Sequence, residues 1–332
     1  VFNYGLFSFN TPNFIFRFSL GETDYQLGAT DYERFAAEYA FFGRSVWQQT
    51  LNLTDEEKTE LIRLLQENYR PENRVYRYNF FYDNCATRPR DKIEESIAGK
   101  VIYPAEPQDG SLTFRDIVHQ YCKGHPWARF GIDLCIGSEA DQPITQRQMM
   151  FAPFYLMDAF DGAQIKGDSI QRPLITANEL IVDATPEPDE SDWMPTPLQC
   201  SLLLFILTAA ATIYGIRRRT GLWGIDLFLF GIAGIVGCVL AFLALFSQHP
   251  AVSSNFLLLV FHPGQLLFLP YIIYCVRKGK KCWYLTLNLA VLTLFIVLFP
   301  VIPQRFDFAV VPLALVLLIR SASNLIVTSK KK

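Results

Sequence analysis

The sequence predicts an α+β soluble domain followed by an all-α bundle of five transmembrane helices. The first observation is an uneven distribution of hydrophobicity: residues 1–197 carry most of the charge, whereas residues 198–327 consist largely of long apolar runs. The second is that the polar part mixes helix-type and strand-type patterns. A chain of 332 residues is long enough to build two separate cores.

The soluble domain is expected over residues 1–182. Thr30 with Glu33 and Thr54 with Glu57 have the spacing of capping boxes, which predicts helices near residues 31–42 and 55–69. Further helical patterns cover residues 113–122, 127–137 and 145–160. Alternation and aromatic content predict strands in residues 1–9, 44–53, 74–82 and 172–183. Because the chain starts at Val1 inside such a strand pattern, we expect an N-terminus that is truncated or processed.

An acidic, proline-rich segment separates the two halves. Residues 183–197, DATPEPDESDWMPTP, contain five acidic residues, four prolines and no basic residue. Such a composition cannot bury apolar surface and repels itself, so we expect an extended linker. Trp193 fits either an interfacial anchor before the first span or a chance aromatic in a loop.

Five apolar segments approach the length needed to cross a bilayer. About 20 helical residues at roughly 1.5 Å each cover a hydrocarbon core of about 30 Å. The segments, within a bundle expected over residues 198–332, are 198–216, 223–246, 255–276, 282–299 and 308–326. An odd number of spans places the two ends of the bundle on opposite sides of the membrane.

Loop charges predict the orientation, because Lys and Arg are enriched in cytoplasmic loops. Basic clusters follow the first, third and fifth spans: Arg217, Arg218 and Arg219, then Arg277, Lys278, Lys280 and Lys281, then Lys330, Lys331 and Lys332. The intervening turns, SQHPAVSS and PVIPQR, contain a single basic residue, Arg305. We therefore expect these turns and the soluble domain on the outer side and the C-terminus in the cytoplasm.

Cys85 is the candidate nucleophile. It lies in NFFYDNCATRPRDKIEES, where an aromatic strand pattern changes to a charged helical one. A thiol is reactive as the thiolate, and the partial positive charge and N–H groups of a helix N-terminus lower its pKa. Arg88 and Arg90 add local positive charge. The alternative is that Cys85 is a small buried residue, as free cysteines commonly are.

The other cysteines point to no metal or cofactor. Cys122 and Cys135 lie in helical patterns and are either core residues or a disulfide pair, and the remaining four lie in or beside the spans. No CxxC pair and no zinc-type spacing occurs, so we expect neither a metal site nor a cofactor. The net charge of −2 and the lack of a basic, aromatic-interleaved stripe in the soluble half argue against a nucleic-acid partner.

A set of motifs resembles the Lnb family of membrane lipoprotein N-acyltransferases. They are VFNYGLFSFNTPNFIFRFSLGETDYQL, NFFYDNCATRPRD and HPWARFGIDLCIGSEAD, followed by five spans with SQHPAVSSNFLLL in the second outward turn. The order of the motifs is more specific than any one of them, and together they cover nearly the whole chain. The resemblance implies a periplasmic domain of the permuted papain-like, NlpC-type fold and a five-helix domain in the inner membrane.

The resemblance also implies the chemistry. In such folds an Asn-Cys pair at a helix start carries the nucleophile, which corresponds to Asn84 and Cys85. The implied partners are a membrane phospholipid as acyl donor, diacylated lipoproteins as acceptors, and the bilayer. The family pattern places a histidine in a GH motif shortly before the NYG segment, so the general base is expected upstream of Val1.

Several polar residues are candidates for supporting roles. Asp83, Arg88 and Asp91 either orient the Cys85 turn or form structural ion pairs. The resemblance favours roles for His249 and Asn255 in the second outward turn, whereas the sequence alone allows an ordinary turn. His119 and His125 are better explained as surface or core histidines, and His262 as a polar packing site beside a kink. Asp133 and Asp141 match family positions without an assigned role.

Two other functions share parts of this pattern. A membrane-anchored papain-like cysteine amidase or peptidase of the cell wall would use the same Cys85 site, but a single tether would serve it as well as five spans. A non-catalytic envelope scaffold would need neither a reactive thiol nor polar residues at the bilayer surface. Trapping an acyl group on Cys85 distinguishes the acyltransferase from both.

Overall fold

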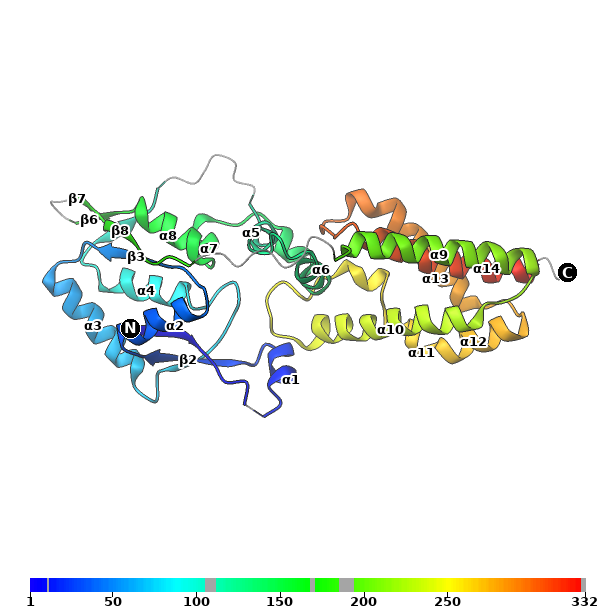
Figure 1. The fold of residues 1–332 in the computed structure, drawn as a ribbon, viewed down its shortest axis with the longest axis horizontal. Helices are drawn as coiled ribbons and strands as arrows, with labels where there is room; N and C mark the ends of the chain where they lie inside the picture. The colour runs from blue at the N-terminus through cyan, green and yellow to red at the C-terminus, as the bar shows by residue number, and fades with distance from the viewer. Residues whose placement is uncertain (11, 105–111, 168–170, 185–193, 330–332) are drawn as a thin grey trace. The chain divides into compact units, whose positions relative to one another are not determined.

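The computed structural model describes residues 1–10, 12–104, 112–167, 171–184 and 194–329. Within them the chain forms two compact units (Figure 1). The first, here called the α+β unit, comprises Val1–Ile117, Pro143–Asp192 and Gln248–Pro250. The second, the helical unit, comprises Val118–Gln142, Trp193–Ser247 and Ala251–Lys332. The predicted fold class, an α+β domain followed by a helical membrane domain, is confirmed.

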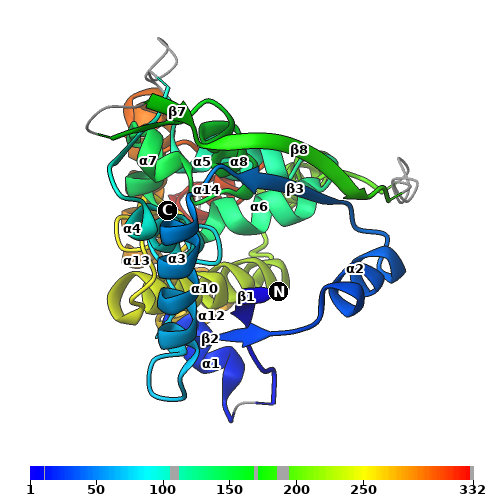
Figure 2. The same ribbon diagram turned by 90° about the vertical axis from the view of Figure 1, so that its left-hand side faces the viewer.

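Three small antiparallel sheets organise the α+β unit. The first has the order β1 (Phe2–Leu6), β2 (Asp24–Ala29), β4 (Val75–Arg77). The second pairs β3 (Val46–Leu51) with β8 (Ile175–Val182), which run side by side as a ribbon in Figures 1 and 2. The third joins β5 (Lys100–Ile102), β6 (Gln164–Lys166) and β7 (Gln171–Pro173).

The helices of the α+β unit are short. They are α1 (Phe14–Ser19), α2 (Tyr32–Phe41), α3 (Asp55–Tyr69), α4 (Thr87–Ser96), α7 (Gln146–Met149) and α8 (Pro153–Asp161). The helix α5 (Phe114–Tyr121) contains the point at which the first unit passes into the second. At α3 the predicted capping box is present, because the Thr54 side chain accepts from Glu57 N–H and the Glu57 side chain from Thr54 N–H.

Three local predictions need correction. The N-cap of α2 is Asp31 rather than Thr30, and its side chain makes no capping bond. The strand predicted over 74–82 ends at Arg77, because the chain turns there and Asn79 pairs with Asp83. The helix predicted over 145–160 is divided into α7 and α8, since Pro153 starts a new helix after the extended residue Ala152.

Two of the apolar clusters among the described residues of the α+β unit bear on the site. One lies between α4, α8 and the β5–β6–β7 sheet and includes Ile97, Phe160, Ile165 and Leu174. The other consists of Tyr4, Leu27 and Tyr76, one residue from each strand of the β1–β2–β4 sheet, with Tyr25 and Tyr78 packed against them. This second cluster is the aromatic surface on which the candidate site is built.

The helical unit contains α6 (Pro126–Cys135) and the apolar helices. Four of these are long and apolar enough to cross a membrane: α9 (Pro197–Arg218), α10 (Trp223–Phe246), α13 (Trp283–Leu298, continued by the 3₁₀ turn Phe299–Val301) and α14 (Val310–Ser329). Their bounds agree with the predicted spans to within a few residues. Thr196 caps α9 with its side chain, and Pro197 occupies the first helical position.

The third predicted span is not one straight helix. Residues 255–276 form a 3₁₀ turn (Phe256–Leu259), then α11 (Gly264–Leu267) and α12 (Leu269–Lys278). The two halves meet at an angle of 74°. The described residues therefore contain four spanning helices, or five if the bent pair crosses as one. Pro263 and Pro270 each lack an N–H for a continuous helix, which accounts for the break.

A continuous apolar cluster fills the helical unit. It includes Phe230 and Leu240 of α10, Ile272 of α12, Leu292 of α13 and Leu317 of α14. All seven cysteines lie in described positions and are free thiols. The disulfide considered for Cys122 and Cys135 is therefore not formed, and both residues are half-buried. The linker segment 185–193, including Trp193, and the basic residues 330–332 lie outside the described residues, so the predicted role of Trp193 and the predicted boundary at 183–197 stay predictions.

Candidate active site

Cys85 occupies an unusual position in its turn. Its neighbours Asn84, Ala86 and Thr87 are all buried, whereas Cys85 itself is exposed. The turn follows the Asn79–Asp83 bridge and leads directly into α4, which begins at Thr87. Cys85 is therefore two residues before the helix, as the sequence predicted, and its flanks are buried while its side chain reaches solvent.

The buried Asn84 side chain holds this turn in place. Its Oδ1 accepts hydrogen bonds from the N–H groups of Ala86 at 2.8 Å and Thr87 at 3.0 Å. Its Nδ2 donates to the carbonyl oxygens of Phe80 and Phe151, both at 2.9 Å. The amide thus uses its acceptor oxygen and both N–H groups on the backbone, which ties the helix start to two other segments of the unit.

These bonds bear on how an oxyanion would be stabilised. The N–H groups of Ala86 and Thr87 bind the Asn84 side chain, and that of Arg88 donates to the Asn84 carbonyl at 3.1 Å. The first N–H groups of α4 are therefore occupied inside the turn. In this arrangement the Asn84 side chain fixes the backbone around Cys85, through bonds that the sequence did not indicate.

The surroundings of the thiol are aromatic. The thiol interacts electrostatically with the hydroxyl groups of Tyr25, Tyr76 and Tyr78, and the Tyr25 and Tyr78 rings stack at 4.0 Å. Although Cys85 is exposed at the surface, partial desolvation raises the pKa of its thiol, and the local backbone N–H opposes this shift only in part. The sequence predicted a pKa lowered by the helix end, whereas desolvation of the thiol acts in the opposite direction.

The Arg88 guanidinium is held between a carboxylate and an aromatic ring. It forms two hydrogen bonds of 2.7 Å with the Asp83 carboxylate. Its Cζ also lies 3.7 Å from the centroid of the Tyr76 ring, which is a close cation–π contact. Arg88 and Asp83 therefore brace the turn against the aromatic cluster, which corresponds to the ion-pair alternative of the sequence analysis.

Arg90 and Asp91 belong to a second ionic group along α4. Arg90 binds Asp91 at 2.8 Å and also donates to the Arg147 carbonyl at 3.0 Å. The Arg147 guanidinium reaches Asp91 at 2.8 Å and Glu94 at 2.8 Å. Burial tends to raise the pKa of Glu94, but hydrogen bonds from Arg147 and Tyr103 lower it overall. This group joins α4 to α7, and within it the positive charge of Arg90 is paired with the Asp91 carboxylate.

His249 lies in the α+β unit, in the short segment Gln248–Pro250. Its Nε2 is 2.6 Å from the Phe18 carbonyl, and its ring packs edge-on against the Phe18 ring. Gly21, with φ at +73°, allows the two segments to approach, because a Cβ at this position would lie only 2.9 Å from the backbone nitrogen of His249. His249 thus holds the end of α1, and its described contacts do not include the Cys85 turn.

Asn255 lies in the helical unit, where it forms a buried amide pair with Gln304. Its Nδ2 donates to the Leu134 carbonyl at 2.7 Å, and its Oδ1 accepts from the Gln304 side chain at 3.2 Å. Gln304 also donates to the Ile136 carbonyl and accepts from Phe256 N–H. These bonds join the end of α6 to the segment before α11, which is a structural role.

The two histidines of the predicted soluble domain, His119 and His125, lie near the start of the helical unit. His119 Nε2 lies 2.8 Å from the buried Asp133 carboxylate, and Arg129 lies 3.9 Å from the same carboxylate. His125 is the N-cap residue of α6. Asp141, the other position matched by the resemblance, binds Arg305 at 3.3 Å. The His119–Asp133 pair is a feature that the sequence spacing alone did not indicate.

His262 lies at the break before α11, as a kinked polar site. Its Nε2 is 3.3 Å from the Asn288 Oδ1, and Asn288 donates onward to the Ser321 hydroxyl at 3.0 Å. This chain connects the break to α13 and α14. The contacts agree with the packing interpretation of His262.

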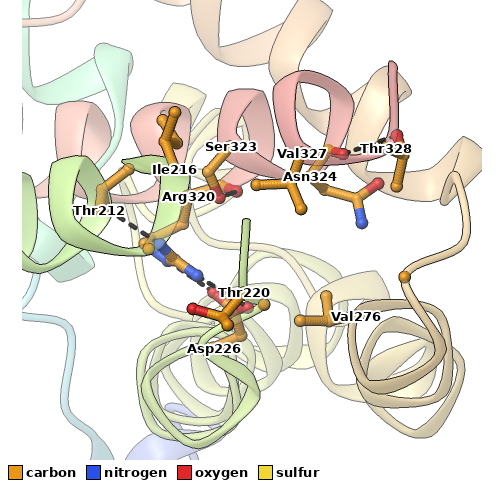
Figure 3. A pocket seen from close by; sticks show the side chains of 13 residues that line it. Thr212, Ile216, Thr220, Asp226, Val276, Arg320, Ser323, Asn324, Val327 and Thr328 are labelled. Carbon is orange, nitrogen blue, oxygen red and sulfur yellow. Dashed lines mark hydrogen bonds and ion pairs between the residues drawn. The ribbon is translucent and has the colours of Figure 1, made fainter. Parts of the chain in front are cut away.

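An ion pair inside the helical unit was missed by the sequence analysis. Arg320 of α14 donates two hydrogen bonds to Asp226 of α10, at 2.7 and 3.0 Å, and a third to Thr212 of α9 at 3.0 Å (Figure 3). Both charged side chains are 2% exposed. The group connects three helices. Each partner stands alone in an apolar run, so a search for charged residues inside predicted spans would have found it.

The structure thus gathers only part of the predicted site. Asn84, Cys85, Asp83, Arg88 and Asp91 lie on one turn and the helix that follows it, whereas His249 holds α1 and Asn255 belongs to the helical unit. Among the described residues, no group of three or more His, Cys, Asp and Glu side chains is placed to hold a metal ion.

Comparisons with known proteins match both halves of the chain. Residues 1–119 match the model of the Lnb N-terminal periplasmic domain, and residues 189–332 match that of the Lnb transmembrane domain. No curated protein and no solved structure matches the chain. The two matches identify a membrane protein with a periplasmic domain.

Proposed function

The chain belongs to the Lnb family, and from this membership together with the exposed Cys85 thiol we propose that it is a lipoprotein N-acyltransferase. The enzyme takes an acyl chain from a phospholipid and carries it as a thioester on Cys85. It then transfers the chain to the α-amino group of the N-terminal cysteine of a diacylated lipoprotein. The soluble domain works in the periplasm, and the helical domain lies in the inner membrane with its C-terminus in the cytoplasm.

The observation that carries the proposal is the exposure pattern of the turn. A cysteine that serves only for packing is expected to be buried with its neighbours. Here the flanking residues are buried and the backbone is fixed by Asn84, while Cys85 itself is an exposed residue. A nucleophile needs this combination of a rigid backbone and an open approach for the substrate.

The reaction follows as a double displacement. A base accepts the Cys85 proton while Sγ attacks the ester carbonyl of the phospholipid, and the lysophospholipid leaves as an alcohol after taking up a proton. The α-amine then attacks the thioester, an amide forms, and the thiol is regenerated. Because the thiol pKa is raised, the proton must pass to a base in the first step.

Orientation is proposed from the loop charges. Arg217 and Arg218 end α9 and Arg277 and Lys278 end α12, so the basic clusters follow the first and third segments. On the positive-inside rule these ends face the cytoplasm. The outer turn with Gln248–Pro250 then faces the periplasm, where the lipoprotein acceptor is found.

The test is to trap the intermediate. The full-length protein in detergent is incubated with a phospholipid that carries a radiolabelled acyl chain and then treated with hydroxylamine, which cleaves thioesters. We expect label on Cys85, its release by hydroxylamine, and its loss in Cys85→Ala. Cys122→Ala, which removes another free cysteine, is the matched control and should retain the label.

Two results would contradict the proposal. The first is a Cys85→Ala protein that still matures lipoproteins to the N-acylated form in cells lacking the native enzyme. The second is release of a cell-wall peptide fragment without any labelled thioester, which would favour the amidase or peptidase instead.

A further inference from the structure

An apolar groove lies on the side of the helical unit. It has a cavity volume of about 170 Å³ and is lined by residues of α6, α9, α10 and α14 and by Phe261. This volume is below the range of roughly 300–1,000 Å³ that is typical of sites for a whole small molecule, so the groove suits a segment of one extended chain. All twelve of its lining residues are apolar. A polar ligand would find no hydrogen-bonding side chain there.

The groove follows from the periodicity of two helices. On α10 the lining residues Leu229, Ile232, Ala233 and Val236 are three or four positions apart and so lie on one face. On α14, Leu313, Val316 and Leu317 repeat the same spacing. Ala233 is the smallest of these, and its short side chain leaves space where the facing residues would otherwise close the gap.

One side of the groove is open and the other is closed. Leu229, Ala233, Val316 and Leu317 are buried and form the floor. Phe228 and Ile232, at the rim, are 62% and 47% exposed. The walls belong to helices long and apolar enough to span a membrane, so the medium at the open side is lipid hydrocarbon.

Two charged residues of α6 are adjacent in sequence to residues that line the groove. Phe130 and Leu134 of α6 line it, and the residues immediately before them are Arg129 and Asp133. The indole N–H of Trp127 donates to the Pro195 carbonyl at 3.0 Å, which holds α6 at the N-terminal end of α9. A helix at the end of a span lies at the level of the lipid head groups, where Trp is favoured. Arg129 is exposed and lies 3.9 Å from the buried Asp133 carboxylate, so it is a loosely paired cation on this helix.

We propose that this groove binds one acyl chain of a phospholipid, with the phosphate of the same molecule beside Arg129. The hydrocarbon lining selects the chain, and the guanidinium selects a lipid with an anionic head-group oxygen. A diacylglyceryl cysteine carries no phosphate, so the charge favours phospholipid over the lipoprotein acceptor. Naming the bound lipid as the acyl donor rests on the proposed function. The binding itself does not.

The test uses a phosphatidylethanolamine with a diazirine in the middle of one acyl chain. The full chain carrying Cys85→Ala is placed in nanodiscs with this lipid and irradiated, and the labelled peptides are identified by mass spectrometry. We expect saturable labelling on α10 and α14. Ala233→Phe, which fills the groove, should lower this labelling by about tenfold, equivalent to roughly 1.4 kcal/mol.

The controls address folding and the identity of the occupant. Ile235→Phe introduces the same ring on the lipid-facing side of α10 and should leave the labelling unchanged. If Ala233→Phe does not fold, Ile232→Trp at the exposed rim gives the same reading. Arg129→Gln should weaken labelling by the phospholipid but not by a photoreactive diacylated lipopeptide.

Three results would overturn the proposal. One is labelling that rises in proportion to lipid without saturating, as ordinary surrounding lipid would give. Another is equal labelling of Ala233→Phe and Ile235→Phe. The third is preferential labelling by the lipopeptide. Because the measurement is made without Cys85, an inactive thiol would leave it unaffected, and the two proposals fail independently.

Discussion

Two arginine–aspartate pairs in this protein have nearly the same geometry and very different surroundings. Arg88 binds Asp83 through two bonds of 2.7 Å in the α+β unit, and Arg320 binds Asp226 at 2.7 and 3.0 Å in the helical unit. The side chains of the first pair are 26% and 42% exposed, whereas both of the second are 2% exposed. Because the two pairs have similar bond lengths but different solvent exposure, a difference in their contribution to stability reports on the environment and not on the contact.

The comparison teaches that the cost of losing a partner depends on where the remaining charge is left. Water and salt can solvate Asp83 or Arg88 when the other is removed. Asp226 or Arg320 would remain in an apolar interior, where an unpaired charge is strongly unfavourable. The first pair therefore shapes a turn, while the second locks three helices.

Breaking the buried pair should have the largest effect. Arg320→Met leaves the Asp226 carboxylate without its partner inside the helical unit, and we expect a loss of about 3–5 kcal/mol in stability. Thermal unfolding in detergent measures it. The double variant Asp226→Leu with Arg320→Met removes both charges and should recover most of the loss; a double variant as unstable as the single one would refute the account.

Removing the amide of Asn84 should have the next largest effect. Asn84→Ala leaves the N–H groups of Ala86 and Thr87 without their acceptor, at a cost of about 1–3 kcal/mol. Thioester formation on Cys85 should fall with it, because the thiol loses its fixed position. Asn79→Ala, which removes a single bond to Tyr82 N–H in the same loop, is the matched control and should change both readings less.

The reactivity of Cys85 should depend steeply on pH. Because the thiol pKa is raised above its ordinary value of 9.0, the neutral form dominates at pH 7, and the thiolate appears only as the pH rises past that value. The rate of iodoacetamide labelling of Cys85 should therefore increase about tenfold per pH unit between pH 7 and 9, because the fraction of thiolate rises tenfold. Labelling in Cys85→Ala gives the background, and a plateau below pH 8 would show that the thiol pKa is lowered instead.

Breaking the exposed pair should have the smallest effect. Asp83→Asn removes the charge but keeps a side chain of the same shape, and we expect a change of about 0–1 kcal/mol in stability. Raising the salt concentration should reduce this difference, whereas the effect of Arg320→Met should be insensitive to salt. A loss for Asp83→Asn as large as that for Arg320→Met would remove the contrast between the two pairs.

Local features of the candidate site were accessible from the sequence. The change from aromatic to charged residues around Cys85 predicted a helix start, and α4 begins two residues later. The spacing of Thr54 and Glu57 predicted a capping box that is present. Both depend on residues within a few positions of each other, so that short-range geometry is sufficient to produce them.

The thiol pKa could not be predicted in the same way. Tyr25 and Tyr76, which interact electrostatically with the Cys85 thiol, come from β2 and β4, and only the pairing of these strands brings them together. Likewise, one of the two Asn84 donor bonds goes to Phe151, far along the chain. The local signals, a helix end and two arginines, suggested a lowered thiol pKa. The opposing contacts come from residues distant in sequence, so the sequence did not reveal them.

By itself, the sequence determined the division into a polar α+β half and an apolar helical half, the approximate bounds of the long helices, and the position of Cys85 just before the start of α4. These follow from periodicity, composition and local capping, which act over one or two helical turns. Only the tertiary structure decided which carboxylate each arginine meets, how the third apolar segment bends, and which face of α10 is left unfilled. These depend on contacts between residues far apart in the chain, and the balance between desolvation and pairing at each contact is set by everything packed around it.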